Sequence, residues 1–98
     1  MKLWVDDLRP APEGWAAVTN SLDALDVLDA LYADGRRLGA LSLDHDLGGD
    51  DTTRPVMLWM CENDWWPTEL YLHTANPVGR DYLEGMARRY APEGTLRP

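Results

Sequence analysis

A short apolar run that breaks directly into acidic side chains lies near the middle of the chain. Leu38–Leu43 is apolar almost throughout, which is typical of a strand covered on both faces. Asp44, His45 and Asp46 follow it immediately. Ligands of open α/β sheets bind beyond the carboxyl ends of the strands, near the point where the strand order reverses. We therefore predict a central parallel strand here, with the residues that follow it in a site.

Two further predicted strands also end in polar side chains. Leu3–Val5 leads into a pair of adjacent carboxylates, and Leu70–His73 leads into a hydroxyl and an amide residue. Adjacent carboxylates repel each other, and a divalent cation would relieve that repulsion. If all three strands are parallel, their carboxyl ends meet at one edge of the sheet. The polar residues of these two strand ends are Asp6, Asp7, His73, Thr74 and Asn76.

Three helices are predicted between and after these strands. Asn20 or Ser21 caps the first helix, which ends near Ala33. Val56–Asp64 is interpreted as a helix because a parallel connection needs a crossover. Asn76-Pro77 combines a preferred cap with a preferred first residue and begins the last helix. The apolar stripes expected to face the core are Leu22, Leu25, Leu28 and Tyr32 in the first helix, widened by Ala24, Val27 and Leu31, and Val78, Tyr82, Met86 and Tyr90 in the last, with Leu83 beside them.

The charge of the chain limits its partners. The 98 residues include 17 acids against 9 bases, for a net charge of −8. This balance argues against binding to a nucleic-acid duplex or an anionic membrane, and it is compatible with cation binding. Cys61 is the only cysteine, so no disulfide framework is expected. Because we find neither a signal peptide nor an apolar run long enough to span a bilayer, we expect a cytoplasmic protein.

The predicted cluster has the chemistry needed for phosphate esters. Carboxylates bind hard cations such as Mg²⁺ through oxygen, and His45 or His73 could move a proton near neutral pH. The free N–H groups of the last helix would point into the site, where they and Arg80 could hold a phosphate. Simpler interpretations stay open, since aspartates often cap turns and Arg80 could be an ordinary surface residue.

Three motifs of the chain are together similar to those of a known family. LWVDDLRPAPEGW, SLDHDLG and HTANPVGR resemble, in order and spacing, the motifs of cyclic-phosphate processing receiver domains. These are a divergent group of the receiver domains of two-component signalling. The resemblance covers roughly residues 3–90. The length of the chain predicts one domain over residues 1–98. The resemblance implies a reduced flavodoxin-like, three-layer α/β sandwich of about four parallel strands in the order 2-1-3-4.

The resemblance also implies roles for the site residues. It implies a metal-dependent phosphoesterase that hydrolyses a small cyclic phosphate of a nucleotide or of an ADP-ribose derivative. Asp44 matches the phosphoacceptor position, so it could be a metal ligand or a nucleophile. From its position, His73 is the better candidate for general acid–base chemistry, because it directly adjoins Thr74 and the start of the last helix. The implied sets are Asp6, Asp7, Asp44 and Asp46 for Mg²⁺ or Mn²⁺, Asp44, His45 and His73 for catalysis, and Thr74, Asn76 and Arg80 for the phosphate.

Departures from ordinary receivers leave alternatives open. Ordinary receivers use a lysine after a fifth strand, whereas Lys2 is the only lysine here and the tail after Tyr90 is short. Aspartyl-phosphate signalling is therefore disfavoured. A noncatalytic pocket that binds or sequesters a cyclic nucleotide would explain the same residues. With no fifth strand, the edge at Leu70–His73 could also pair with a second copy of the chain to form a homodimer.

Overall fold

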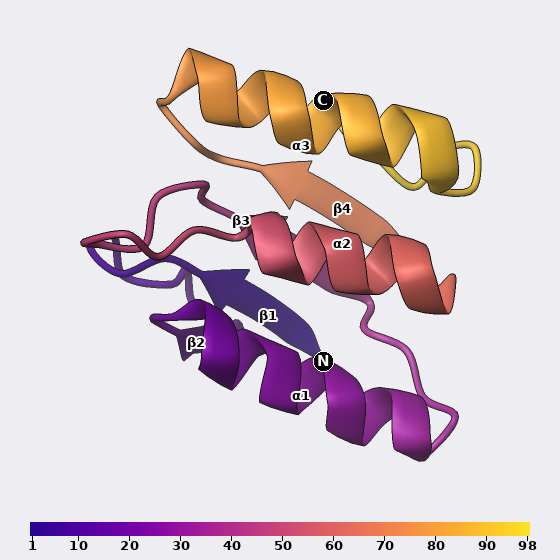
Figure 1. Ribbon diagram of the computed structural model, residues 1–98. Helices are drawn as coiled ribbons and strands as arrows, with labels where there is room; N and C mark the ends of the chain where they lie inside the picture. The colour runs from indigo at the N-terminus through magenta and orange to yellow at the C-terminus, as the bar shows by residue number, and fades with distance from the viewer.

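A four-stranded sheet accompanied by three helices forms the structure, a computed structural model that describes all residues 1–98 (Figure 1). All neighbouring strands are parallel, and their order is β2-β1-β3-β4, as predicted. No helix has the length and apolar character that crossing a membrane would require. In chain order the elements are β1 (Lys2–Val5), β2 (Ala16–Val18), α1 (Ser21–Ala33), β3 (Ala40–Leu43), α2 (Arg54–Asn63), β4 (Glu69–Leu72) and α3 (Pro77–Tyr90).

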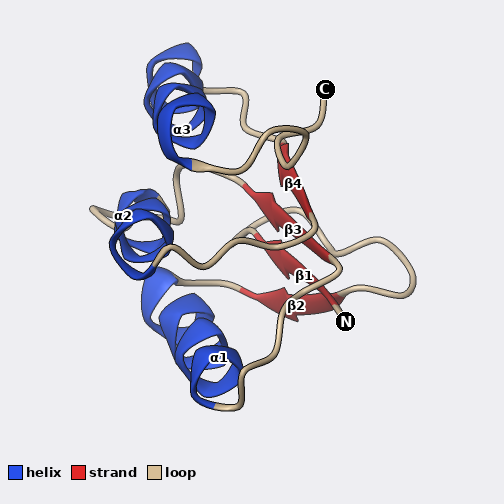
Figure 2. Cartoon of the chain, turned by 90° about the vertical axis from the view of Figure 1, so that its right-hand side faces the viewer, coloured by secondary structure: helices blue, strands red, loops and turns tan.

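All three helices cover the same face of the sheet, so the predicted third layer is absent (Figure 2). A right-handed crossover from β1 to β2 would place a helix on the opposite face. That connection is instead an irregular loop over residues 6–15. Pro10 and Pro12 disfavour a helix in the loop, and Gly14 has a positive φ of 89°. No helix follows α3, so that face carries no helix.

Aromatic side chains occupy the helix-free face. Trp4 of β1 and Tyr71 of β4 are half-buried, because Trp15 from the β1–β2 loop packs edge-on against both rings. The Trp4 indole N–H donates to the backbone oxygen of Arg9 at 3.0 Å. This bond ties the loop to the sheet, so the loop partly takes the place of the missing helix.

The hydrophobic core lies between the sheet and the helices. The apolar residues of β1, β3 and β4 that face the helices are nearly all fully buried. The predicted helical stripes were right in part. Leu25, Leu28, Tyr82 and Met86 pack in or against the core, whereas Leu22 is 72% exposed and Val78 is 69% exposed. The buried positions of the two helices include several small residues, which let α1 and α3 pack closely against the core. The buried positions are Ser21, Ala24, Leu28 and Leu31 in α1 and Gly79, Leu83 and Ala87 in α3.

The outer edge of β4 is partly covered by the residues after α3. The Leu70 amide donates to the Thr95 oxygen at 2.8 Å, and the Arg97 amide donates to the Leu70 oxygen at 2.9 Å. The Leu72 oxygen accepts a hydrogen bond from the Arg80 guanidinium at 2.7 Å. The prediction of an open edge is therefore wrong at Leu70, and the homodimer through this edge stays a prediction.

Candidate functional site

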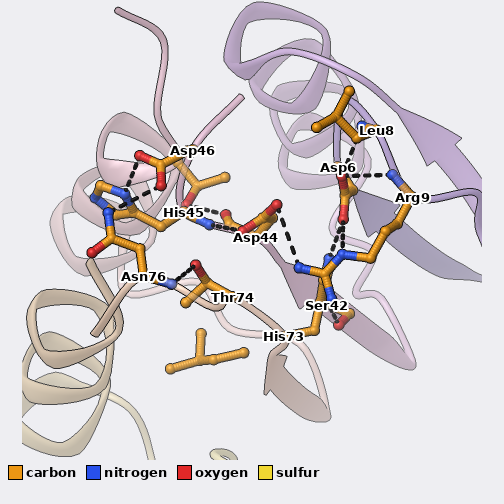
Figure 3. A network of polar contacts seen from close by, with 12 residues as sticks. Asp6, Leu8, Arg9, Ser42, Asp44, His45, Asp46, His73, Thr74 and Asn76 are labelled. Carbon is orange, nitrogen blue, oxygen red and sulfur yellow. Dashed lines mark hydrogen bonds and ion pairs between the residues drawn. The ribbon is translucent and has the colours of Figure 1, made fainter. Parts of the chain in front are cut away.

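The three predicted strand ends do meet at one edge of the sheet. Val5 pairs with Leu43, and Leu43 with Leu72, so Asp6, Asp44 and His73 are each the first residue beyond matched strand ends. One ligand atom from each of these three residues lies within 4.8 Å of the others (Figure 3). We call this group the Asp6–Asp44–His73 cluster.

The carboxylate of Asp6 is the buried anionic centre of the cluster. Its Oδ1 accepts hydrogen bonds from the amides of Leu8 at 2.9 Å and Arg9 at 3.0 Å. Its Oδ2 accepts one from His73 Nε2 at 2.9 Å. Burial alone would raise the pKa of Asp6, but these hydrogen bonds outweigh burial and hold the pKa below its ordinary value. Asp6 is therefore ionised at neutral pH.

His73 is held in one orientation on three sides. Its Nε2 faces Asp6, its Nδ1 lies 2.7 Å from Ser42 Oγ, and its ring stacks on Trp4 with a centroid distance of 3.8 Å. Because the ionised Asp6 can only accept, Nε2 carries the proton and Nδ1 accepts from the Ser42 hydroxyl. Burial lowers the pKa of His73, against the opposing effect of Asp6, so the ring is neutral.

The Ser42–His73–Asp6 arrangement has the composition of a nucleophilic triad, yet its position does not suit one. Ser42 is only 2% exposed and lies on β3 under the His73 ring, away from the surface that a substrate could reach. Its hydroxyl therefore orients the histidine and does not attack a substrate.

The pKa shifts of His73 and Asp6 predict how stability depends on pH. Both folded-state pKa values lie below their ordinary values of 6.5 and 3.8, so the unfolded chain binds more protons. The free energy of unfolding should fall as the pH drops below 6.5 through the folded-state pKa of His73. It should fall again as the pH drops below 3.8 through the folded-state pKa of Asp6. Urea denaturation between pH 8 and pH 3 would measure this. A His73→Gln variant should lose the first decline, and a wild-type stability that rises from pH 7 to pH 5 would contradict the assignment.

The carboxylate of Asp44 lies near the positively charged side chain of Arg9, which follows the end of β1. Its Oδ1 accepts the His45 amide at 2.8 Å, and its backbone oxygen accepts the buried Thr53 hydroxyl at 2.6 Å. Its Oδ2 lies 3.8 Å from the Arg9 guanidinium, whose Nε is also 3.3 Å from Asp6 Oδ2. Sequence reasoning missed Arg9. The one sequence feature that could have indicated Arg9 is its position as a single basic residue two positions after the acidic pair Asp6-Asp7.

A small polar hollow of about 290 Å³ opens beside the cluster. Thr74 is nearly buried there, and its hydroxyl accepts the Asn76 amide at 3.1 Å, which leaves the hydroxyl proton for another acceptor. Five of the predicted residues line the hollow, whereas Asp6, His45, His73 and Arg80 do not. The full lining is Asp7, Leu8, Arg9, Asp44, Asp46, Gly48, Thr74, Ala75 and Asn76.

The side chains of Asp46 and Asn76 are hydrogen-bonded to each other, so they are less available to a ligand than predicted. Asn76 Oδ1 caps α3 by accepting the amides of Val78 and Gly79, both at 3.1 Å. The prediction that these amides point freely into the site is therefore wrong. Asn76 Nδ2 donates to Asp46 Oδ2 at 3.0 Å, and this bond, followed by one from His45, lowers the pKa of Asp46. Neither Asp46 nor Asp7 belongs to the Asp6–Asp44–His73 cluster.

The structure does not bring His45 or Arg80 into the hollow. His45 is 5% exposed, its Nδ1 lies 3.0 Å from Asp46 Oδ1, and its Nε2 accepts from Arg54 Nε at 2.9 Å. Its ring packs directly against the backbone of Gly79 in α3. Arg80 lines a separate hollow of about 480 Å³ between α3 and the residues that follow it.

The fold and the acidic edge together define a receiver-like α/β domain. The family model of the cyclic-phosphate processing receiver domain matches residues 1–89, and the chain belongs to this family. Neither the curated proteins nor the solved structures include a match to the chain. The resemblance of the three sequence motifs is thereby confirmed.

Proposed function

We propose that the chain is a metal-dependent phosphoesterase that binds and hydrolyses a small cyclic phosphate of a nucleotide or an ADP-ribose derivative. The observation that carries the proposal is the Asp6–Asp44–His73 cluster beside a polar hollow. Family membership supports the association with cyclic phosphates. Hydrolysis, the metal and the identity of the substrate are our proposal.

The cluster fits a divalent cation. The guanidinium of Arg9 already lies against both carboxylates, so the space between Asp6 and Asp44 suits positive charge. Two carboxylates suit Mg²⁺, and an imidazole nitrogen also suits Mn²⁺. Asp6, Asp44 and His73 would hold the ion, which would acidify a bound water and neutralise phosphate charge. As a ligand, His73 would give up its Nε2 proton and donate from Nδ1 to Ser42.

The hollow supplies the groups that would position the ester. The Thr74 hydroxyl has a proton to donate to a phosphate oxygen. The hollow also adjoins the start of α3 at Ala75 and Asn76, where the helix dipole favours an anion. Asp44 Oδ2 faces the same space and would act as a metal ligand or as a nucleophile.

³¹P NMR of the purified domain with a panel of cyclic phosphates tests the proposal. The panel would hold 2′,3′- and 3′,5′-cyclic nucleotides and a cyclic phosphate of ADP-ribose, each with Mg²⁺, Mn²⁺ or chelator. We expect a metal-dependent conversion of one cyclic ester to a monoester. Asp44→Asn should slow it by at least about 100-fold, the scale of losing one preorganised transition-state contact. Asp26→Asn on the exposed side of α1 is the matched control. Undiminished turnover by Asp44→Asn would refute the role of Asp44.

A noncatalytic binding module is the second candidate. It is favoured by the observation that neither histidine lines the hollow and that both ring nitrogens of each have a protein partner. In the same ³¹P experiment such a module would shift or broaden the ligand signal with no product and with little dependence on metal.

A further inference from the structure

Arg9 has a fixed backbone and a loosely held side chain. Its amide donates to Asp6 Oδ1 at 3.0 Å, and its backbone oxygen accepts the Trp4 indole at 3.0 Å. Its guanidinium lies 3.3 Å from Asp6 Oδ2 and 3.8 Å from Asp44 Oδ2, while the side chain is 51% exposed. Charge-assisted bonds in good geometry are about 2.7–2.9 Å long. The side chain can therefore leave the carboxylates without disturbing the loop.

The position of this guanidinium conflicts with metal binding. Arg9 bridges two members of the Asp6–Asp44–His73 cluster and supplies the positive charge that a metal would bring (Figure 3). Two cations cannot share this space without strong repulsion. Arg9 also lines the polar hollow, and a guanidinium fork matches the geometry of a phosphate.

We propose that Arg9 is the resident counter-cation of Asp6 and Asp44, and that it turns to the phosphate of the ligand when a divalent cation replaces it between them. This inference rests on the proposed function, because it needs both the cation and the phosphate at this edge. It assigns Arg9 two opposed effects. The side chain weakens metal binding in the free domain and strengthens phosphate binding in the metal-loaded domain.

Calorimetric titrations with Mn²⁺ alone, and then with inorganic phosphate on the Mn²⁺-saturated domain, separate the two effects. Arg9→Gln should bind Mn²⁺ about fivefold more tightly, the upper range for removing a partly exposed ion pair. It should bind phosphate about tenfold more weakly, since a charge-assisted contact is lost. Arg37→Gln, an exposed arginine outside the hollow, should change neither affinity. General damage to the site would weaken both affinities together, so opposite signs are diagnostic.

Arg9→Lys keeps the charge and removes the fork. We expect its Mn²⁺ affinity to stay within about twofold of the wild type while its phosphate affinity falls, because lysine contacts phosphate as a point charge. If the wild type bound Mn²⁺ as tightly as Arg9→Gln or more tightly, the role of Arg9 alone would be overturned. A phosphate affinity that is unchanged in Arg9→Gln would overturn the same role. Absence of Mn²⁺ binding in every variant would overturn the proposed metal site and this inference with it.

Discussion

Gly79→Ala should destabilise the domain by about 3 kcal/mol, the upper range for overpacking a tight core. A Cβ at Gly79 would lie 2.2 Å from His45 Cγ and 2.6 Å from Nδ1. The ring has no simple escape, because Asp46 and Arg54 bond its two nitrogens. Urea denaturation would measure the change in the free energy of unfolding.

Gly85→Ala is the matched control on the same helix. A Cβ there meets nothing within 4 Å, and Gly85 is exposed. Replacing a helical glycine with alanine at such a position should stabilise by roughly 0.5–1 kcal/mol. A second check adds His45→Ala to Gly79→Ala, because removal of the ring makes room for the methyl group. Equal effects of the two glycine substitutions would show that α3 does not pack on His45 as described.

Asp6→Ala should destabilise the domain by roughly 3 kcal/mol, because it removes a buried charge that has several partners. The amides of Leu8 and Arg9 would lose their acceptor, and His73 Nε2 would lose its partner. Asp7→Ala, at a half-buried neighbour, should cost less than about 1 kcal/mol. Thermal and urea unfolding of both variants at pH 7 would compare them.

Asp6→Asn should be milder than Asp6→Ala for a specific reason. The asparagine oxygen can still accept the two amides, and its NH₂ group can donate to Nε2 once His73 moves its proton to Nδ1. Nδ1 would then donate to Ser42, which reverses the bond in the wild type. Nitrogen-15 chemical shifts of the His73 ring would report the change of tautomer. If Asp6→Asn were as unstable as Asp6→Ala, this hydrogen-bond assignment would be wrong.

The sheet and its acidic edge were predictable because they depend on patterns of residue type. Short apolar runs alternate with helical periodicity, which together with the family resemblance predicted four parallel strands in the observed order. Parallel strands place their carboxyl ends together, so the convergence of Asp6, Asp44 and His73 followed from the strand order. The Asn76 cap and the start of α3 at Pro77 were also confirmed.

The buried faces of the helices and the side-chain partners depend on tertiary packing, whereas the prolines of the β1–β2 loop already disfavour the helix of a third layer. Val78 has a larger apolar side chain than Gly79, yet Val78 is exposed and Gly79 faces the core. The His45 ring leaves no room for a side chain at the position of Gly79. The sequence places both His45 and His73 at strand ends, but the ring of His45 lies under α3 and the ring of His73 lies on Trp4. Arg9 belongs to an irregular loop, where no periodicity indicates the direction of its side chain.

Paramagnetic broadening by Mn²⁺ in a ¹H–¹⁵N NMR spectrum tests the central claim most directly. The claim is that three strand ends build one cation site. At substoichiometric Mn²⁺ we predict that the signals of Asp6, Asp44 and His73 broaden first, while Gly85 of α3 stays sharp. Asp44→Asn should weaken this effect, and Mg²⁺ should reverse it by competition. Broadening centred on the exposed aspartates of α1, or none at these strand ends, would contradict the account.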